Sequence, residues 1–201
     1  MSTTAVESHH GEHHHHYDGS KSVFGFWIYI MSDCVLFATL FAVYAVFHTH
    51  TFGGPSAKEL FSLPFVFIET MLLLMSSFTF GLAMLSRNSG NIKLITGWLW
   101  VTFILGLGFI IMEVYEFHHL YMEGHTWAQS AFLSSFFTLV GTHGLHVSIG
   151  LIWIVSMIFQ IRKHGITPMS KTKLTYLGLF WHFLDIVWIF VFSVVYLMGA
   201  I

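Results

Sequence analysis

Residues 94–115, LITGWLWVTFILGLGFIIMEVY, form an apolar run in which Glu113 is the only charged side chain. A helix of about 20 apolar residues crosses the ~30 Å hydrocarbon core of a bilayer, so this run is long enough for one span. Backbone amides find no water in that core, and a continuous apolar run satisfies them as an α-helix rather than as a barrel strand. The stretch therefore predicts a transmembrane helix.

Four more apolar runs flank this stretch, at about residues 23–47, 61–85, 131–161 and 174–199. The 201-residue chain is 55% hydrophobic and 9% charged, whereas roughly 25% of the residues in an average soluble domain are charged. We therefore expect an all-α integral membrane bundle of five transmembrane helices that occupies residues 23–201. The single thiol, Cys34, excludes an intrachain disulfide, and the few scattered basic residues give no indication of a nucleic-acid partner.

The basic residues are distributed unevenly between the two sides of the expected bundle. One side carries seven of the eight, which are Lys21, Arg87, Lys93, Arg162, Lys163, Lys171 and Lys173. The other side carries only Lys58, between the first two apolar runs. Cytoplasmic connections of membrane proteins are enriched in Lys and Arg. The pattern predicts a cytoplasmic N-terminus and a C-terminus on the far, periplasmic side.

Residues 1–22 are polar and contain six of the fifteen histidines, within ESHHGEHHHHYDGSK. Such a segment buries too little apolar area to fold alone, so we expect a disordered cytoplasmic tail. Gly11 and Glu12 interrupt the histidines, which favours a native tail over an affinity tag. Divalent metal would bind the tail adventitiously, and a solvated tail is favoured over a dedicated role in metal delivery. The segment lacks the basic start of a secretory signal peptide, so the first apolar run is expected to be retained.

Eight ionisable side chains are predicted to lie within the spans. They are Asp33, Glu69, Glu113, Glu116, His143, His146, His182 and Asp185. Such groups are costly in hydrocarbon, so they normally face neighbouring helices or cavity water. Spacings of three residues place 113 with 116, 143 with 146, and 182 with 185 on shared helix faces. We expect a buried polar network whose role is structural or proton-related.

The histidine pair 143 and 146 lies in GTHGLHVSIG, residues 141–150. Ligation of haem or a metal would require a partner at the same depth on another helix, and only His182 qualifies. The favoured alternative has neutral imidazoles that bond carboxyls or carbonyls and hold three helices together. Small residues around the pair predict close helix packing, with the 131–161 helix at the centre of the bundle.

The buried carboxyls have two interpretations. Asp33 and Glu69 lie well inside their spans, where no Lys or Arg is predicted to pair with them. They would either line a proton path or serve as neutral hydrogen-bond donors, and the second interpretation is favoured because burial disfavours charge. Glu113 and Glu116 lie nearer the outer end of their helix, where a solvated rim and an interhelical contact are equally compatible with the sequence. The aromatic residues expected to face lipid or to pack include Trp181, Phe183 and Trp188.

Several segments together resemble subunit III of the haem-copper terminal oxidases. The resemblance rests on WIYIMSDCVLFATLFAVYAVFH (27–48), MEVYEFHHL (112–120), SFFTLVGTHGLHVSIG (135–150) and WHFLDIVWIFVFSVVYLMG (181–199). It covers the chain from about residue 25 to residue 199, and HGLHV followed by WHFLDIVW is a highly specific combination. Members of this family typically carry seven helices, and the quinol-oxidising members resemble them without the first two. With five expected helices, this chain resembles the quinol-oxidising group.

The resemblance implies a non-redox accessory subunit of a proton-pumping terminal quinol oxidase, multi-pass in the bacterial cytoplasmic (inner) membrane. Ubiquinol oxidation and reduction of oxygen to water would take place on partner subunits, with haem and copper in subunit I. This chain would pack directly against subunit I, with subunits II and IV in the same complex. It would bind phospholipid and support proton uptake, without catalytic, cofactor-binding or metal-ligating residues of its own. The buried Glu of the cytochrome c oxidase relatives matches Asp33, which is one methylene shorter.

Three alternatives remain open at this point. The first is subunit III of a cytochrome c oxidase. The second is a b-type cytochrome whose haem is held by His182 with His143 or His146. The third is a small proton-coupled transporter that uses the carboxyls at 33, 69 and 185, although the sequence shows neither an inverted repeat nor a pair of Gly/Pro-broken helices.

Overall fold

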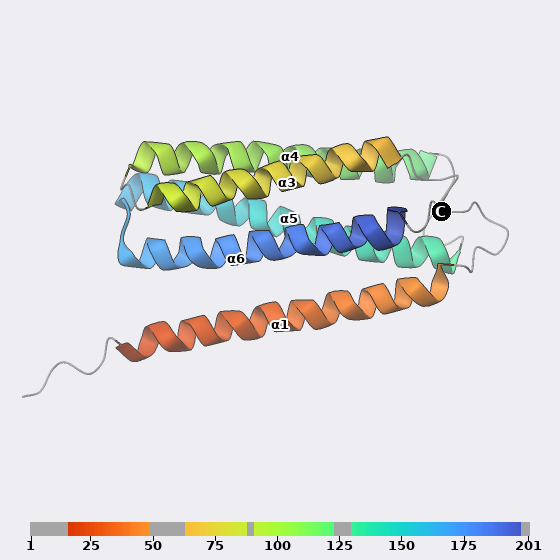
Figure 1. Ribbon diagram of the computed structural model, residues 1–201, viewed down its shortest axis with the longest axis horizontal. Helices are drawn as coiled ribbons and strands as arrows, with labels where there is room; N and C mark the ends of the chain where they lie inside the picture. Colours follow the sequence, from red (N-terminus) through yellow and green to blue (C-terminus); the bar gives the residue numbers. More distant parts are fainter. Residues whose placement is uncertain (1–15, 49–62, 88–90, 123–129, 198–201) are drawn as a thin grey trace, which may run out of the picture. The chain divides into compact units, whose positions relative to one another are not determined.

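The computed structural model describes residues 16–48, 63–87, 91–122 and 130–197. Within these ranges it contains five helices that are long and apolar enough to cross a membrane. They are α1 (His16–Phe47), α3 (Leu63–Ser86), α4 (Ile92–Met122), α5 (Ala131–His164) and α6 (Pro168–Val191), which continues directly into the π-helical segment η2 (Phe192–Leu197) (Figure 1). The expected all-α membrane fold with five spans is confirmed.

The chain divides into two compact units within α1. The first unit ends at Leu36 and contains, among the described residues, the first part of α1. The second unit begins at Phe37 and contains the rest of α1 together with α3, α4, α5, α6 and η2. Of the eight candidate polar residues, Asp33 belongs to the first unit and the others belong to the second.

Hydropathy locates the centre of each span better than its ends. α1 begins at His16, so residues 16–22, expected in the disordered tail, are helical. α4 continues to Met122, past the predicted end at 115, and α6 begins at Pro168, before the predicted start at 174. Polar residues prolong a helix readily once an apolar segment has nucleated it, because each added residue gains one hydrogen bond. The rest of the His-rich tail, residues 1–15, lies outside the described residues.

The connection between α5 and α6 is short because both helix ends are capped locally. Gly165 follows the last residue of α5 with a φ of 73°, a left-handed conformation that glycine adopts without strain. Its N–H donates to the Ile161 carbonyl oxygen at 3.0 Å. The Thr167 hydroxyl then accepts from the Ser170 N–H at 3.1 Å, with Pro168 at the first helical position. The chain therefore leaves one helix and enters the next within three residues, 165–167.

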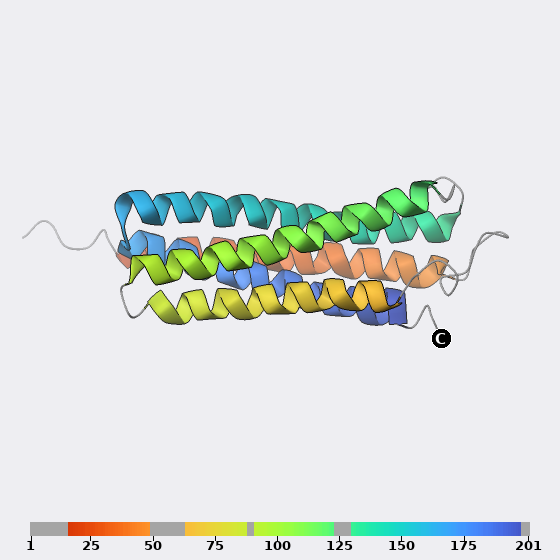
Figure 2. The ribbon, with the colours of Figure 1, turned by 90° about the horizontal axis from the view of Figure 1, so that it is seen from above.

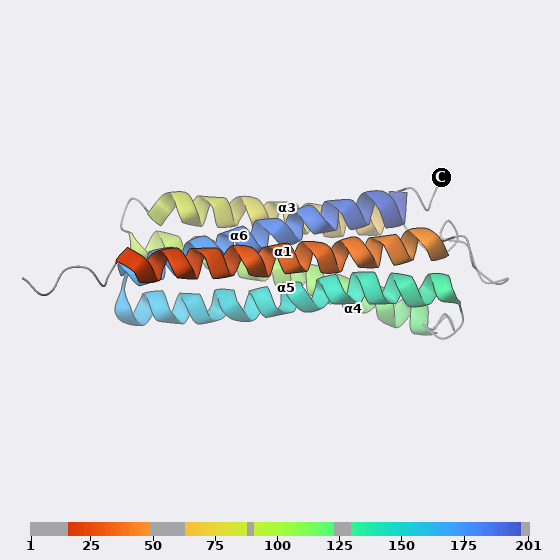
Figure 3. The ribbon, with the colours of Figure 1, turned by 90° about the horizontal axis from the view of Figure 1, so that it is seen from below.

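In the second unit, α3, α4, α5 and α6 form a ring in which each helix contacts the next and α6 contacts α3. Consecutive helices of the ring run antiparallel (Figure 2). The last part of α1 packs on α5 and α6, where the Phe37 ring lies 5.3 Å from that of His146 and 6.4 Å from that of Phe183 (Figure 3). The 131–161 helix was expected at the centre, but α6 with η2 is the most enclosed of the five spans.

Two tryptophans of α6 fill the interior of the ring. Trp181 is 1% exposed and Trp188 is fully buried, so both pack inside the protein rather than face lipid. The Trp181 indole N–H donates to the Ser76 hydroxyl at 3.1 Å. The Trp188 indole N–H donates to the Thr70 hydroxyl, also at 3.1 Å. Hydroxyl groups on α3 thereby satisfy the only polar atom of each buried indole and fix the register of α6 against α3.

Two glycines make room for the Trp181 ring. A Cβ at Gly150 on α5 would lie 2.9 Å from that ring, and a Cβ at Gly106 on α4 would lie 3.0 Å from it. Small residues at such positions let helix backbones approach closely inside a membrane. The indole of α6 therefore lies against the backbones of two neighbouring helices.

We expect Gly150→Leu to lower the free energy of unfolding by about 1–3 kcal/mol, because overpacking displaces the Trp181 ring. Gly97→Leu is the matched control, since a Cβ at Gly97 would meet no atom within 4 Å. Denaturation in detergent, followed by tryptophan fluorescence, measures both variants. Equal stability of the two would contradict this packing.

Candidate functional site

The predicted polar residues of the second unit form three groups rather than one network. The groups are Glu69, Glu113 and Glu116 between α3, α4 and η2; His143 and His146 on α5; and His182 and Asp185 on α6. Each group has its own partners on neighbouring elements.

The acidic group lies where α3, α4 and η2 meet. Glu69 is fully buried, and Glu113 is 3% exposed. Glu69 is close enough to Glu113 and Glu116 to interact electrostatically with both. Tyr196 of η2 donates its hydroxyl proton to Glu116 Oε2 at 3.0 Å. The three carboxyls and the phenol therefore join three elements at one place in the interior.

The burial of Glu113 decides between the two interpretations of that residue. α4 runs on to Met122, so Glu113 lies about 13 Å before the helix end at 1.5 Å per residue. Its carboxyl lies over the α5 backbone at Gly144, where a Cβ would be 2.6 Å from the carboxyl carbon. The absence of a side chain at Gly144 leaves the space that the carboxyl occupies. The position of Glu113 agrees with the interhelical interpretation, and Glu116 is half-buried one turn later.

His143 joins α5 to α6. Its side chain is fully buried, and its Nε2 atom bonds the Leu184 carbonyl oxygen at 3.2 Å. The ring lies 5.0 Å from that of Trp188 at an angle of 32°, and 5.7 Å from that of Phe109 at an angle of 88°. The imidazole is therefore enclosed by aromatic rings and bonded to backbone on the facing helix.

His146 has different partners from His143. Its Nδ1 atom bonds the Thr142 carbonyl oxygen of its own helix at 2.7 Å, and its ring lies beside Phe37 of α1. The spacing of three residues thus gives the two imidazoles different neighbours. Within the described residues, no group of three or more His, Cys, Asp or Glu side chains is arranged to hold a metal ion.

His182 and Asp185 of α6 both form hydrogen bonds with Ser77 of α3. The Nδ1 atom of His182 lies 2.6 Å from the Ser77 hydroxyl oxygen, and Asp185 also forms a side-chain hydrogen bond with Ser77. Asp185 is 9% exposed, whereas His182 is exposed. The proposed third haem or metal ligand, His182, is therefore engaged with α3, while His143 is engaged with the α6 backbone. The shared helix face predicted for 182 and 185 is confirmed by their common partner.

Asp33 belongs to the first unit and interacts there with a neighbour on its own helix. Tyr29, one turn earlier on α1, forms a side-chain hydrogen bond with Asp33. This contact agrees with the interpretation of Asp33 as a hydrogen-bonded carboxyl. Its role in proton transfer stays a prediction.

Sequence reasoning missed the hydroxyl groups that serve these clusters. Thr70 and Ser76 of α3 bond the buried indoles, Thr79 bonds Thr102 of α4 at 2.9 Å, and Tyr196 bonds Glu116. On α3 only Ser76 and Thr79, three residues apart, share a helix face, and Thr70 lies about 120° from Ser76 around a helix of 3.6 residues per turn. The spacing of Ser76 and Thr79 was therefore a signal available in the sequence, whereas no such spacing marked Thr70. Tyr196 had none, because an aromatic residue near the end of a span is usually an interfacial residue.

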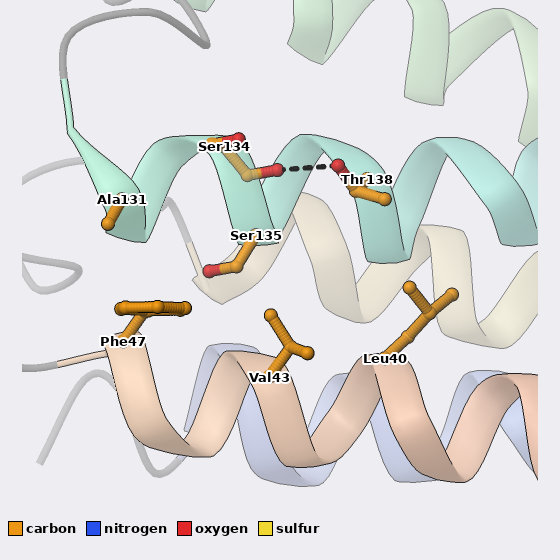
Figure 4. A pocket seen from close by; sticks show the side chains of 7 residues that line it. All are labelled: Leu40, Val43, Phe47, Ala131, Ser134, Ser135 and Thr138. Atoms are coloured by element: carbon orange, nitrogen blue, oxygen red, sulfur yellow. Dashed lines mark hydrogen bonds between the residues drawn. The ribbon is translucent and has the colours of Figure 1, made fainter.

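In the second unit, a groove lies between the last part of α1 and the start of α5. In Figure 4 the side chains of Leu40, Val43 and Phe47 on α1 point toward α5. Its lining residues are Leu40, Val43, Phe47, Ala131, Ser134, Ser135 and Thr138. Within α5 the Thr138 hydroxyl donates to the Ser134 carbonyl oxygen at 2.7 Å, so this polar group is satisfied by the helix itself. The groove is therefore largely apolar.

Comparison with known proteins gives consistent results along the whole chain. Residues 3–200 match the family Cytochrome c oxidase subunit III. The cytochrome bo(3) ubiquinol oxidase subunit 3 of Pseudomonas aeruginosa is 56% identical, over 100% of both chains. That of Pseudomonas putida is 58% identical over 92% of this chain and 90% of its own. The cytochrome c oxidase subunit 3 of Bacillus sp. (strain PS3) is 45% identical over 92% of this chain and 89% of its own.

These matches agree with the five spans and with the polar residues of HGLHV and WHFLDIVW that lie inside them. They extend over α1, α3, α4, α5 and α6, so no described helix lies outside the region of similarity. The chain belongs to the cytochrome c oxidase subunit III family.

Proposed function

We propose that this protein is a non-redox accessory subunit of a proton-pumping ubiquinol oxidase in a bacterial inner membrane. One observation carries the proposal, namely the similarity to a ubiquinol oxidase subunit 3 over the whole of both chains. The geometry supports the non-redox part, because His143 bonds backbone on α6 and His182 bonds Ser77 on α3. Electron transfer from ubiquinol to oxygen then takes place on the haem- and copper-bearing subunit I.

The role of this chain in such a complex is to support subunit I and its surroundings in the membrane. It packs against subunit I, with subunits II and IV in the same assembly, and supports proton uptake. The apolar groove between α1 and α5 is a suitable place for a phospholipid acyl chain. Six of the eight candidate residues act as interhelical or intrahelical hydrogen-bonding groups that keep the bundle rigid, namely Asp33, Glu116, His143, His146, His182 and Asp185. Glu69 differs from them, because neither of its buried carboxyl oxygens has a hydrogen-bond partner among the described residues.

Three other functions are less well supported. A cytochrome c oxidase would use a similar subunit, and the Bacillus sp. (strain PS3) relative carries that name at lower identity. A b-type cytochrome would need His182 together with His143 or His146, yet their bonds lead to different helices. A proton-coupled transporter would use Asp33, Glu69 and Asp185, which lie in different units or different polar groups.

Affinity purification in mild detergent tests the proposed function. We expect the tagged chain to recover larger partners with a haem spectrum and ubiquinol oxidase activity. The chain purified alone should show no Soret band. A Soret band from the isolated chain that disappears in His143→Ala or His182→Ala would instead support the b-type cytochrome. Oxidation of cytochrome c but not of ubiquinol by the purified complex would identify the other oxidase class.

Reporter fusions test the orientation that places seven basic residues in the cytoplasm. Alkaline phosphatase fused after residue 201 should be active, because the enzyme folds only in the periplasm. Green fluorescent protein fused after residue 165, between α5 and α6, should fluoresce, because it folds in the cytoplasm. The reverse pattern would contradict the proposed orientation.

Removal of one hydroxyl tests the structural role of the acidic group. We expect Tyr196→Phe to lower the free energy of unfolding by about 0.6 kcal/mol and by no more than about 1.7 kcal/mol, the average and the maximum for one interhelical hydrogen bond in a membrane. Tyr115→Phe on the exposed face of α4 is the control and should change it little, because Tyr115 is 59% exposed. Denaturant titration in detergent measures both. Loss of proton pumping in Tyr196→Phe with unchanged stability would instead indicate a proton-handling role.

A further inference from the structure

The second unit carries an open groove on its outer surface, between α3 and α6. Its volume is about 540 Å³. It is lined by Leu74, Ser77, Phe78, Gly81, Leu82, Leu85, His182 and Asp185. We infer that this groove, hereafter the α3–α6 groove, receives a transmembrane helix of the haem-bearing subunit that presents a hydrogen-bonding side chain to His182. This inference rests on the proposed function and adds the surface and the chemistry of the contact.

The polar residues of the α3–α6 groove lie at the depth of the bilayer centre. α6 and η2 together run from Pro168 to Leu197, so His182 is about 21 Å along the axis from Pro168 at 1.5 Å per residue. Ser77 is about 13 Å from the end of α3 at Ser86 by the same rise. Neither position is near enough to a helix end for a side chain of this size to reach the interface. Water and headgroups therefore do not satisfy these groups.

The hydrogen bonds within the trio leave one nitrogen for a partner. The Nδ1 atom of His182 lies 2.6 Å from the Ser77 hydroxyl oxygen, and Asp185 also forms a side-chain hydrogen bond with Ser77. Either Ser77 or Nδ1 donates, depending on the tautomer of the imidazole, so Nε2 of His182 is an acceptor in one tautomer and an N–H donor in the other. The side chain is exposed, so the group that meets Nε2 must itself form a hydrogen bond, as a hydroxyl or an amide does in either direction.

The shape of the α3–α6 groove suits a helix. Ser77 and Gly81 are one turn apart on α3, and a Cβ at Gly81 would meet no atom within 4 Å. Two small residues at this spacing allow a neighbouring helix backbone to approach closely. Phe78 and Leu85 stand beside them, 62% and 69% exposed. Small residues in the middle with large apolar ones at the side form a surface into which a second helix fits.

The chemistry favours a protein helix over a lipid chain. An acyl chain fills apolar space but has neither a donor nor an acceptor for His182, so Nε2 of the imidazole would stay unsatisfied in hydrocarbon. A helix supplies both the apolar side chains for Leu74 and Leu85 and one hydrogen-bonding side chain at the level of His182. The haem-bearing subunit of the proposed complex is the membrane partner that this chain has to recognise.

Photocrosslinking in the assembled oxidase tests this inference. The substitution Phe78→p-benzoylphenylalanine places a reactive ketone beside the α3–α6 groove. The matched control is Ile104→p-benzoylphenylalanine on α4, because Ile104 is 63% exposed and Phe78 is 62% exposed. After irradiation of the purified complex, we expect a crosslink to the haem-bearing subunit from position 78 and none from position 104. A crosslink from position 78 to lipid only, to another copy of this chain, or to a different subunit would overturn the inference.

A steric block provides the second test. Gly81→Trp should reduce the haem-bearing subunit recovered with the tagged chain by about tenfold relative to wild type, because the indole occupies the space of the docking helix. Gly97→Trp is the control, since a Cβ there also meets no atom within 4 Å. The amount of each chain in the membrane and its unfolding midpoint report whether the subunit itself folds. Equal recovery from the two variants, at equal folding, would overturn the inference.

The two proposals fail in different ways. If the wild-type chain recovers no haem-bearing partner, the proposed function is wrong. If the wild-type complex is intact but position 78 does not reach the haem-bearing subunit, the proposed function stands and the assignment of the α3–α6 groove is wrong.

Discussion

Polar groups inside a bilayer have no water to bond, and this constraint organises the second unit of the chain. Its clearest expression is the pair of buried tryptophans, whose indole N–H groups bond the hydroxyls of Ser76 and Thr70 on α3. Apolar side chains alone do not select one helix neighbour over another in lipid, because lipid tails are equally apolar. The pairing of α3 with α6, which are distant in the chain, therefore depends on these polar contacts.

Close packing of the helices in the second unit also depends on the size of the side chains that face one another. Gly106, Gly144 and Gly150 stand opposite the Trp181 ring or the Glu113 carboxyl, and a Cβ at any of them would clash with that group. A large side chain facing a bare backbone brings neighbouring helices together and leaves little free volume. The shape of the unit is therefore set by contacts between side chains and the backbones of neighbouring helices. Such packing supports the proposed role of the chain as a supporting subunit in the membrane.

The number of spans followed directly from composition, whereas the contacts between spans did not. Counting residues along each run placed Glu69, Glu113 and His143 at useful depths, but depth does not say which helix face meets which neighbour. His143 and His146 illustrate this point, because the first bonds the α6 backbone and the second bonds its own helix. Glu113 was ambiguous because α4 extends beyond its apolar run to Met122. Tyr196 was missed because it is buried within the π-helical segment, which the sequence pattern did not predict.

The π-helical segment η2 also has a consequence for how the protein is made. Ribosomes deliver the chain from the N-terminus, so η2 reaches the membrane after every other described helix. It carries the phenol that bonds Glu116 and the Val195 carbonyl oxygen that accepts from the Tyr44 hydroxyl of α1 at 3.3 Å. Until η2 has entered the membrane, Tyr44 of α1 and Glu116 of the acidic group lack these two hydrogen bonds. The insertion of η2 is thus the step that links the end of α1 and the acidic group to the rest of the second unit.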